Sequence, residues 1–406
     1  MRGAGDQLTV GERIAFYRRR RGLTQAVLAG LVGRSEDWLS KIERGERQAR
    51  RLDVLADLAR ALRVTIGDLL GQPVLVGTDR AGHDDIPAIR DSLMSPRRLS
   101  KTLFAAVEPA LPVDHLTRLA EAGWNDFQKG RLGKVVSVLP TLITGAQAVE
   151  GPASGPRNNG WAVSARVHHL AATALAKVGE ADLAWMAAER AMSAADQSED
   201  PLVLASAARA GTHALLAVGR YDDAMALGMR AAEWLRGRAP DGPAALSLLG
   251  MLYLRSATAA ARRQDRSTTS SFIEEAERIA DQLGVDGNYW QTGFGPTNVR
   301  LHRVSAALEL GDVETVLNQP RLRWTPHLPQ ERAAEYHIAL ARALSMVARD
   351  SDSLEELLAA EALAPELVRH SAVVRETLKT MYRRSSPTAS KSPALSRLAQ
   401  RCSVLE

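Results

Sequence analysis

The chain has 406 residues, of which 45% are hydrophobic and 4% aromatic, with 52 basic and 47 acidic side chains. A chain of this length and apolar content can bury more than one hydrophobic core, so two or more domains are expected. Its single cysteine, Cys402, excludes an internal disulfide. Neither a run of about eighteen uncharged apolar residues nor a signal-peptide pattern occurs, so we expect a cytoplasmic protein with no membrane partner.

The positive charge is concentrated at the N-terminus. Residues 1–70 hold 14 basic and 9 acidic side chains, which accounts for the whole net charge of +5, and the remaining residues hold 38 of each sign. A surplus confined to one segment is what neutralisation of nucleic-acid phosphates requires. The run from Arg18 to Arg21 taken alone is also typical of a solvated helix end.

Residues 23–45 are the most informative segment, because they predict two short helices joined at Gly33. Thr24 and Ser35 are residue types that cap helix N-termini. Gly33 supplies the positive φ that a tight turn between two helices needs. Ala29 is small enough for the second helix to cross closely. The apolar residues that would face inward together are Leu28, Val32, Leu39 and Ile42.

Further helices are predicted on both sides of this pair. A capping box formed by Thr9 and Glu12 opens a first helix that runs through Tyr17. Apolar residues at helical spacing between positions 52 and 62 predict a fourth helix: Leu52, Leu55, Leu58, Ala59 and Leu62. Residues 64–70 would form a fifth. We therefore expect a five-helix N-terminal domain over residues 1–76.

The spacing of Gln25, Ala29, Gly33, Leu39 and Ile42, ending in Ile-Glu-Arg-Gly, resembles the phage-repressor and Cro-like (XRE) family of helix-turn-helix DNA-binding domains. The resemblance covers about residues 8–71. It implies a bacterial transcriptional regulator with a double-stranded DNA operator as its partner. The low lysine share of the basic residues, seven of 52, is typical of a high-GC bacterial genome.

The same resemblance implies roles for individual residues. Lys41 is the candidate for a guanine edge, and Gln25 would cap its helix toward a phosphate. An ion pair between Arg18 and Glu43 would tie the first helix to the end of the recognition helix. The full set at DNA-binding positions is Gln25, Arg34, Ser35, Glu36, Asp37, Ser40, Lys41 and Arg44.

Two of these positions, and the neighbouring Trp38, leave alternatives open. Glu36 and Asp37 would either accept hydrogen bonds from cytosine amino groups or simply favour the positive end of the helix dipole. Trp38 would either cover a sugar or thymine methyl group or pack against its own domain. Arg34 stands where the family usually has an apolar residue.

After residue 71 the composition changes. Residues 77–112 are predicted to be a linker with a short helix around residues 88–94, because Gly, Pro and Asp are frequent before that helix. From residue 113 to 384 only helical periodicity is found, so the fold class is all-α. The tail, residues 385–406, is rich in Ser and Pro and basic, and is predicted to be disordered.

A helical-hairpin pattern recurs in this long region. The predicted turns lie at Gly130, Gly179, Gly219, Gln264, Gly311 and Arg349. The clearest copy, residues 216–224, resembles a tetratricopeptide (TPR) repeat, although the turns are 38 to 49 residues apart rather than about 34. We expect a TPR-like α-solenoid of stacked hairpins that acts as a sensor and as the surface of a homodimer.

In a TPR-like hairpin the first helix lines the concave face, and fixed positions before each turn project into it. These positions are Arg166, His169, Thr173, Lys177, Arg209, His213, Thr258, Arg262, Asn298 and Ser305. They are either solvated side chains on an ordinary surface or a polar cavity for a peptide or anionic small-molecule effector, with Trp290 and Phe294 as apolar walls. The second reading predicts that Arg166, Arg209 and Asn298 converge on one cavity.

No chemistry typical of an enzyme is found in the sequence. A Gly-rich phosphate loop, a zinc-ligand spacing and a nucleophile elbow are all absent. His168 and His169 are adjacent and would point about 100° apart on a helix, so they cannot share a metal. We expect no catalysis, no cofactor and no metal. Two functions stay open: a DNA-binding transcriptional regulator with an effector sensor, or a TPR interaction scaffold localised to DNA. An antitoxin-like use is disfavoured by the large second domain.

Overall fold

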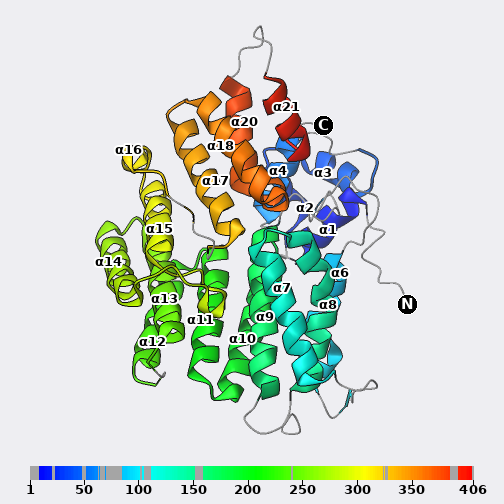
Figure 1. The fold of residues 1–406 in the computed structure, drawn as a ribbon. Helices are drawn as coiled ribbons and strands as arrows, with labels where there is room; N and C mark the ends of the chain where they lie inside the picture. Colours follow the sequence, from blue (N-terminus) through cyan, green and yellow to red (C-terminus); the bar gives the residue numbers. More distant parts are fainter. Residues whose placement is uncertain are drawn as a thin grey trace. The chain divides into compact units, whose positions relative to one another are not determined.

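The computed structural model describes residues 9–20, 23–47, 52–62, 64, 69, 85–100, 103–104, 111–150, 159–238, 241–322, 324, 328–384 and 392–404. It divides into two compact units, residues 1–84 and residues 85–406, which are considered separately. Every regular element in the described ranges is a helix (Figure 1). The all-α fold class predicted from the sequence is therefore confirmed.

The N-terminal unit contains four helices in the part that the structure describes. They are α1 (Val10–Arg20), α2 (Gln25–Leu31), α3 (Glu36–Glu43) and α4 (Leu52–Leu62). The predicted capping box is present at the start of α1, where the Thr9 N–H donates to Glu12 Oε2 at 2.7 Å and the Glu12 N–H donates to Thr9 Oγ1 at 3.3 Å. The predicted fifth helix lies mostly outside the described residues.

The core of this unit is built from residues that the helical spacing selects. Leu28, Leu39 and Ile42 are buried as predicted, and Val32 packs against them while half-buried. They meet Ile14 of α1 and apolar residues of α4 in one cluster. Because α1, α2 and α4 all pack on this cluster, α3 is held by its inner face and presents its other face outward.

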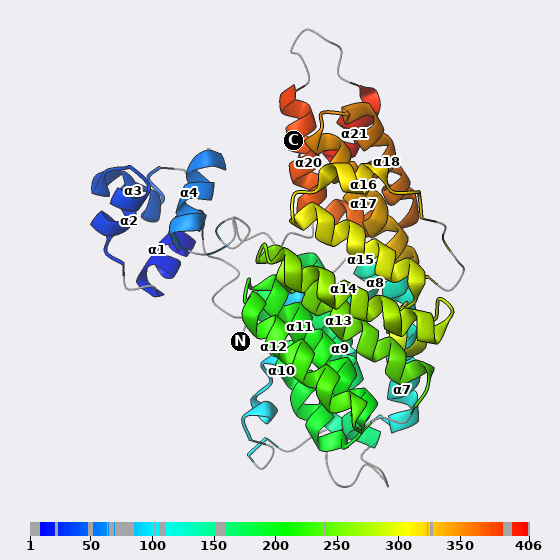
Figure 2. The same cartoon turned by 90° about the vertical axis from the view of Figure 1, so that its left-hand side faces the viewer.

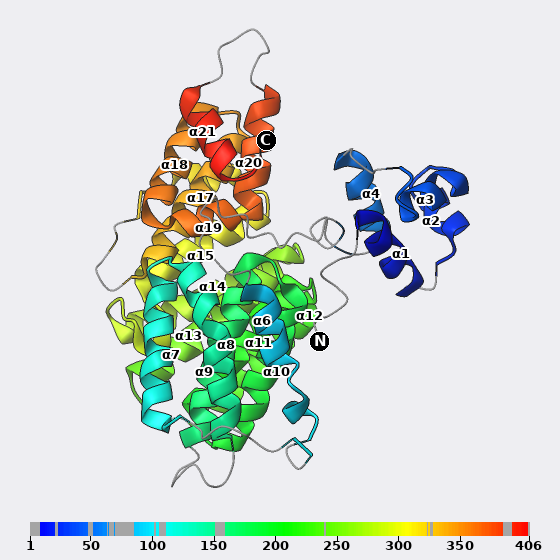
Figure 3. The same cartoon turned by 90° about the vertical axis from the view of Figure 1, so that its right-hand side faces the viewer.

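The second unit is a series of helices in which most chain neighbours are also neighbours in space. Its elements are α6 (Asp85–Leu93), the 3₁₀ turn η1 (Pro96–Arg98), α7 (Val113–Gln128), α8 (Leu132–Val149), α9 (Asn159–Val178), α10 (Ala181–Ser198), α11 (Pro201–Ala217), α12 (Tyr221–Arg236), α13 (Pro243–Arg262), α14 (Arg266–Leu283), η2 (Tyr289–Gln291), α15 (Pro296–Glu309), α16 (Val313–Asn318), α17 (Gln330–Met346), α18 (Asp350–Leu363), α19 (Pro365–His370), α20 (Ala372–Arg384) and α21 (Pro393–Arg401). Figure 2 shows α11 to α14 side by side, and Figure 3 shows the same arrangement for α7 to α10. This is the predicted stack of TPR-like hairpins.

All six hairpin turns contain a residue in the left-handed region. Five are at predicted positions, with φ of 73° to 88° for the four glycines and 64° for Gln264; the sixth is Ala348 at 59°, one residue before the predicted Arg349. Each turn returns a backbone N–H to the end of the first helix, as when Arg220 N–H donates to the Leu215 carbonyl at 2.9 Å. This Schellman geometry ends one helix and directs the chain straight into the next.

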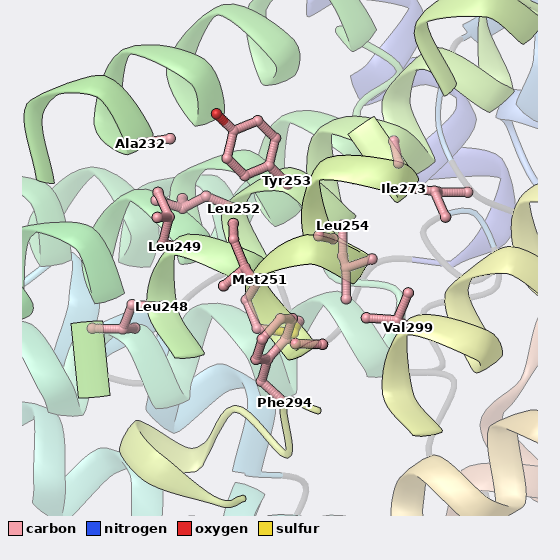
Figure 4. Close-up of a cluster of buried hydrophobic side chains, with 14 of the residues drawn as sticks. Ala232, Leu248, Leu249, Met251, Leu252, Tyr253, Leu254, Ile273, Phe294 and Val299 are labelled. Carbon is pink, nitrogen blue, oxygen red and sulfur yellow. The ribbon is translucent and has the colours of Figure 1, made fainter. Parts of the chain in front are cut away.

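A large apolar cluster of the second unit surrounds α13, and Figure 4 shows it in close-up. Met251, Leu252 and Leu254 are fully buried there beside Val299 of α15. Phe294, which we expected to be a wall of the effector cavity, is fully buried in this core instead. Its ring occupies the space that a side chain at Gly250 would need, because a Cβ there would lie 1.9 Å from the ring.

Two predicted boundaries are wrong. The short helix assigned to the linker, α6, belongs to the second unit: Ile89 and Leu93 are buried, and α8 reaches α6 through a 2.7 Å hydrogen bond from Gln147 Nε2 to the Ser92 carbonyl. The tail predicted to be disordered includes α21, whose Leu395 and Leu398 are buried in a cluster shared with α18 to α20. The low average hydropathy of the tail conceals a narrow apolar stripe at helical spacing.

On length and composition alone, α8 and α13 are apolar enough to cross a membrane. In α8, 56% of the apolar window is buried inside the protein, and in α13 the share is 72%. Helices of the interior of an α-solenoid have this composition because they pack against helices on several sides. We therefore interpret both as core helices.

We predict that Gly250→Ala destabilises the second unit by about 1–3 kcal/mol, because the added methyl group must displace the buried Phe294 ring. Urea unfolding followed by circular dichroism measures the change. Gly237→Ala is the matched control, since no atom lies within 4 Å of a Cβ built there. A Gly250→Ala protein as stable as the control would contradict the packing described for Phe294.

Candidate functional site

The first candidate site is the pair of helices α2 and α3. Thr24 caps α2 by accepting from the Val27 N–H at 3.2 Å, and Ser35 caps α3 by accepting from the Trp38 N–H at 3.2 Å. Between them Gly33 has a φ of 65°, and the Arg34 N–H donates to the Ala29 carbonyl at 2.9 Å. These local interactions produce the short turn expected of a helix-turn-helix.

A buried ion pair fixes α3 against α1. Arg18 donates from Nε to Glu43 Oε1 at 2.6 Å and from an η nitrogen to Oε2 at 2.8 Å, so the pairing is bidentate. The side chains are 10% and 4% exposed. Burial alone would raise the pKa of Glu43, but hydrogen bonds from Arg18 and Gln25 outweigh it and hold that pKa below its ordinary value. The ion pair predicted from the sequence is present.

Gln25 takes part in this arrangement. Its Nε2 donates to Glu43 Oε2 at 2.8 Å, so the amide supports the ion pair instead of pointing freely toward a phosphate. Gly11 lies at the same crossing, where a Cβ would come within 2.0 Å of the Ile42 carbonyl oxygen. The start of α1 and the end of α3 therefore approach as closely as their backbones permit.

The outer face of α3 is exposed and charged. Lys41 Nζ lies 2.7 Å from Asp37 Oδ2, one helical turn away, and the two side chains are 44% and 70% exposed. Arg44 Nε pairs with Glu46 Oε1 at 3.1 Å, while Glu36 is exposed. An exposed pair of this kind is worth little, so Lys41 is available to a stronger anion.

The side chain of Trp38 packs against the core of its own unit while half-buried, which is the second of the two roles left open for it. The Arg34 guanidinium lies over its ring, 5.6 Å from the centroid. This contact accounts for a charged residue at a position where apolar residues are usual, because the indole covers the arginine stem and leaves the cation at the surface.

The second candidate site is a small cavity inside the helical unit. It is lined by Trp124, Phe127, Gln128, His169, Thr173, Arg209, His213, Arg255, Gln291, Thr292, Pro329, Glu331 and Arg332. Its volume is about 20 Å³, room for a water molecule or two. The lining comes from α7, α9, α11, α13, η2 and α17, which lie far apart in the sequence.

Four of the residues predicted for an effector line this cavity: His169, Thr173, Arg209 and His213. Arg166, Arg262, Asn298 and Ser305 do not, so the expected convergence of Arg166, Arg209 and Asn298 is wrong. The register of a regular repeat does not carry through hairpins whose turns are 38 to 49 residues apart.

The residues that miss the cavity have other partners. Arg166 lies 5.6 Å from the Trp290 ring centroid and 3.8 Å from Glu121. Ser305 donates to its own helix at the Leu301 carbonyl, at 3.1 Å. Asn298 is buried and donates from Nδ2 to the Thr292 carbonyl at 3.5 Å, which stabilises a residue of the lining from behind.

Charged residues that we did not predict border the cavity. Glu331, Arg332 and Glu335 of α17 meet Lys177 of α9, and both carboxylates pair with the lysine and with Arg332. Arg255 of α13 adds a further cation. Arg255 precedes the predicted Arg262 by seven residues, which places it two helical turns away on nearly the same face of α13. This spacing is the one signal in the sequence that could have identified Arg255. For α17 only the fold reveals the role, because the turn register was not applied there.

Burial governs the ionisation of this region. Desolvation and neighbouring arginines lower the pKa of His169 and His213 well below the ordinary value, so both imidazoles are neutral near pH 7. Desolvation, reinforced by other cations, also lowers the pKa of Arg209 to about 9 and that of Arg255 to about 10. The arginines keep their charge near pH 7, at a cost in free energy.

A strained loop closes one side of the cavity. Trp290 and Gln291 both have left-handed backbone conformations, with φ of 54° and 52°. The side chains of Asn288 and Gln128 bond each other reciprocally at 2.8 and 3.0 Å, which ties the loop to α7. This conformation directs the Gln291 carbonyl toward an Arg209 η nitrogen at 3.4 Å. Such conformations cluster at ligand sites.

Comparison with known proteins agrees with the N-terminal geometry. Residues 9–70 match the helix-turn-helix domain family. A 77-residue stretch is 34% identical to the immunity repressor protein of Bacillus phage phi105. The aligned stretch covers 19% of this chain and 53% of that protein. The chain thus spans about half the length of this curated relative. Residues 9–70 are therefore similar to a helix-turn-helix domain, and in the structure an all-helical unit follows them.

Two solved structures resemble the chain at a coarser level. One is Bacillus thuringiensis PlcR in complex with the peptide PapR7 and DNA, with 16% identity, 68% of this chain and 95% of that chain covered, and a TM-score of 0.31. The other is ComR from S. thermophilus in complex with DNA and its signalling peptide ComS, with 13% identity, coverage of 87% and 99%, and the same TM-score. At this score neither structure bears on what the present chain does.

We predict that Glu43→Ala destabilises the N-terminal unit by about 3 kcal/mol, because it leaves the buried Arg18 guanidinium without a carboxylate. Amide hydrogen exchange in α1 and α3 measures the change. The Glu43 contribution is complete above its unfolded pKa of about 4.3 and is lost as the pH falls through the lower folded value.

Glu46→Ala is the control for that measurement, since its partner Arg44 is exposed and the loss should stay below about 0.5 kcal/mol. Equal losses in the two variants would show that the ion pair does not hold the helices together.

Proposed function

We propose that the protein is a sequence-specific DNA-binding transcriptional regulator. The observation that carries the proposal is the helix-turn-helix geometry itself: α3 is capped, held by a buried ion pair on its inner side, and exposed on its outer side. A helix presented in this way enters the major groove of duplex DNA. The segment also holds the entire net positive charge of the chain.

In this proposal the DNA contacts are divided among the predicted residues. Lys41 exchanges its partner Asp37 for a base edge or phosphate, and Ser40 and Arg44 follow on the same face. Gln25 acts mainly by supporting Glu43. Asp37 serves as the resting partner of Lys41, which is a role that neither alternative for this residue included.

The helical unit is proposed to sense a peptide or small-molecule effector. What supports this function over an interaction scaffold is the kind of hollow found: it is lined mainly by polar and charged side chains and lies between helices, whereas a scaffold would present an open apolar groove. We propose no catalytic role for either unit.

We further propose that the regulator acts in the cytoplasm of a bacterium and binds DNA as a homodimer. One helix-turn-helix domain contacts few base pairs, and two such domains bound to a symmetric site multiply the sequence specificity. The helical unit offers the larger surface for the dimer.

We predict that affinity for duplex DNA falls steeply with salt, because the charge surplus lies in the helix-turn-helix segment. At a site selected from random duplexes, Lys41→Ala should lose about 10- to 100-fold, corresponding to about 1–3 kcal/mol for a base contact. The loss of affinity for random duplex DNA should be much smaller. Fluorescence anisotropy over a salt series measures both quantities.

Lys379→Ala is the control, since this lysine lies on α20, far along the chain from the helix-turn-helix, with its side chain 38% exposed and paired with Glu376. A flat salt dependence would remove DNA as the partner. Equal loss on selected and random DNA for Lys41→Ala would reassign Lys41 to a phosphate contact.

We predict two chains on each selected DNA site. Analytical ultracentrifugation at micromolar concentration, with a labelled duplex that contains the site, measures the mass of the complex. A complex of one chain per site, with full affinity, would refute the homodimer.

A further inference from the structure

The charges around the cavity do not balance. Arg209, Arg255, Arg332 and Glu331 line the cavity. Lys177 and Glu335 lie next to it and pair with these residues, so four cations face two carboxylates. Both carboxylates contact Lys177 and Arg332, and Glu331 Oε1 has no hydrogen-bond partner among the described residues. Glu335 Oε2 accepts from Arg332 at 2.9 Å while its other oxygen contacts Lys177, and Glu331 Oε1 lies 3.2 Å from the same lysine.

Arg209 and Arg255 are left over. Arg209 is 5% exposed, and the residues around it offer only weak acceptors: the Gln291 carbonyl and His169 Nε2, each at 3.4 Å. Arg255 makes no hydrogen bond or ion pair with any part of the chain that the structure describes, and its buried Nε has no partner. A buried guanidinium without a carboxylate is costly, and proteins normally supply a counter-charge.

The rest of the lining suits an anion as well. His169 and His213 are neutral because the surrounding cations and burial oppose their protonation. His169 already contacts Arg209 through Nε2 and Ser206 through Nδ1, so His213 is the imidazole that can donate a ring N–H to a ligand. Gln128 is held by Asn288, and Thr173 adds a hydroxyl group. Arg209 also contacts the strained Gln291, so the same guanidinium joins the hollow to the loop that closes it.

We propose that this cavity binds the oxyanion group of a small molecule, a carboxylate or a phosphate, between the guanidinium groups of Arg209 and Arg255. This inference deepens the proposed sensing function and rests on it. A guanidinium offers parallel N–H donors that match both kinds of oxyanion. The volume of about 20 Å³ limits the cavity to a group of a few atoms, so it would hold only the charged end of the effector.

The proposal predicts that one substitution of a buried charged residue does not lower the melting temperature. Arg255→Gln removes an unpaired cation from a desolvated site, so in chloride buffer the variant should melt at a temperature equal to or above that of the unaltered protein. The unaltered protein should gain about 2 °C or more in sodium phosphate or sodium succinate at matched ionic strength. Arg255→Gln and Arg209→Gln should both lose this gain.

The control is Arg262→Gln. Arg262 stands two turns after Arg255 on α13 but is exposed and does not line the cavity. Phosphate stabilises most proteins to some degree through exclusion from their surface, and this general effect should be the same in the control and in both cavity variants. A response to phosphate alone assigns a phosphate ligand, and a response to succinate alone a carboxylate.

Overturning results are equally clear. The proposal fails if Arg262→Gln loses the gain as fully as Arg255→Gln does, or if neither anion stabilises the unaltered full-length protein more than chloride. Binding to selected duplex DNA is measured on the same proteins without added anion. Retained DNA binding with no anion response rejects the cavity assignment alone, and an anion response with no DNA binding rejects the regulator function alone.

Discussion

The left-handed residue at each hairpin turn is the constraint on which the helical unit depends. A helix that ends in this conformation has its last carbonyl groups bonded within the turn, and the chain reverses within a few residues. Gly179 and Gly219 adopt the conformation without strain, and Gln264 and Ala348 adopt it at a cost. Short reversals keep partner helices in contact along their length. The alanine-rich faces then pack closely, and His169 and Thr173 of α9 come to line one cavity with Arg209 and His213 of α11.

How much of this the sequence predicts follows from the range of each interaction. The caps at Thr9, Thr24 and Ser35 and the six turns depend on residues within five positions of one another, and they are found where expected, with one turn displaced by a single residue. The Arg18–Glu43 pair spans 25 positions. It was predicted only because it belongs to a known family pattern.

The cavity illustrates what sequence reasoning misses. Its wall combines α9, α11 and α13 with α17, and nothing local to Glu331 or Arg332 indicates that they face Lys177. Conversely, Asn298 fits the predicted register yet points into the core. Average composition also misled at the C-terminus, where Leu395 and Leu398 suffice to dock a helix. Tertiary packing determines where each of these residues lies, and no short sequence pattern predicts that packing.

The bond between Gln128 and Asn288 has a consequence for how the helical unit unfolds. An open solenoid has only contacts between adjacent repeats, so it can fray from either end. Here the first hairpin is fastened to a loop 160 residues later, and the Gly133 N–H at the start of α8 donates to Glu366 of α19. The array is closed on itself, so loss of a terminal hairpin breaks contacts in the middle as well. Such a ring of repeats should melt as one cooperative body and fold slowly for a helical protein, because its closing contacts join distant parts of the chain.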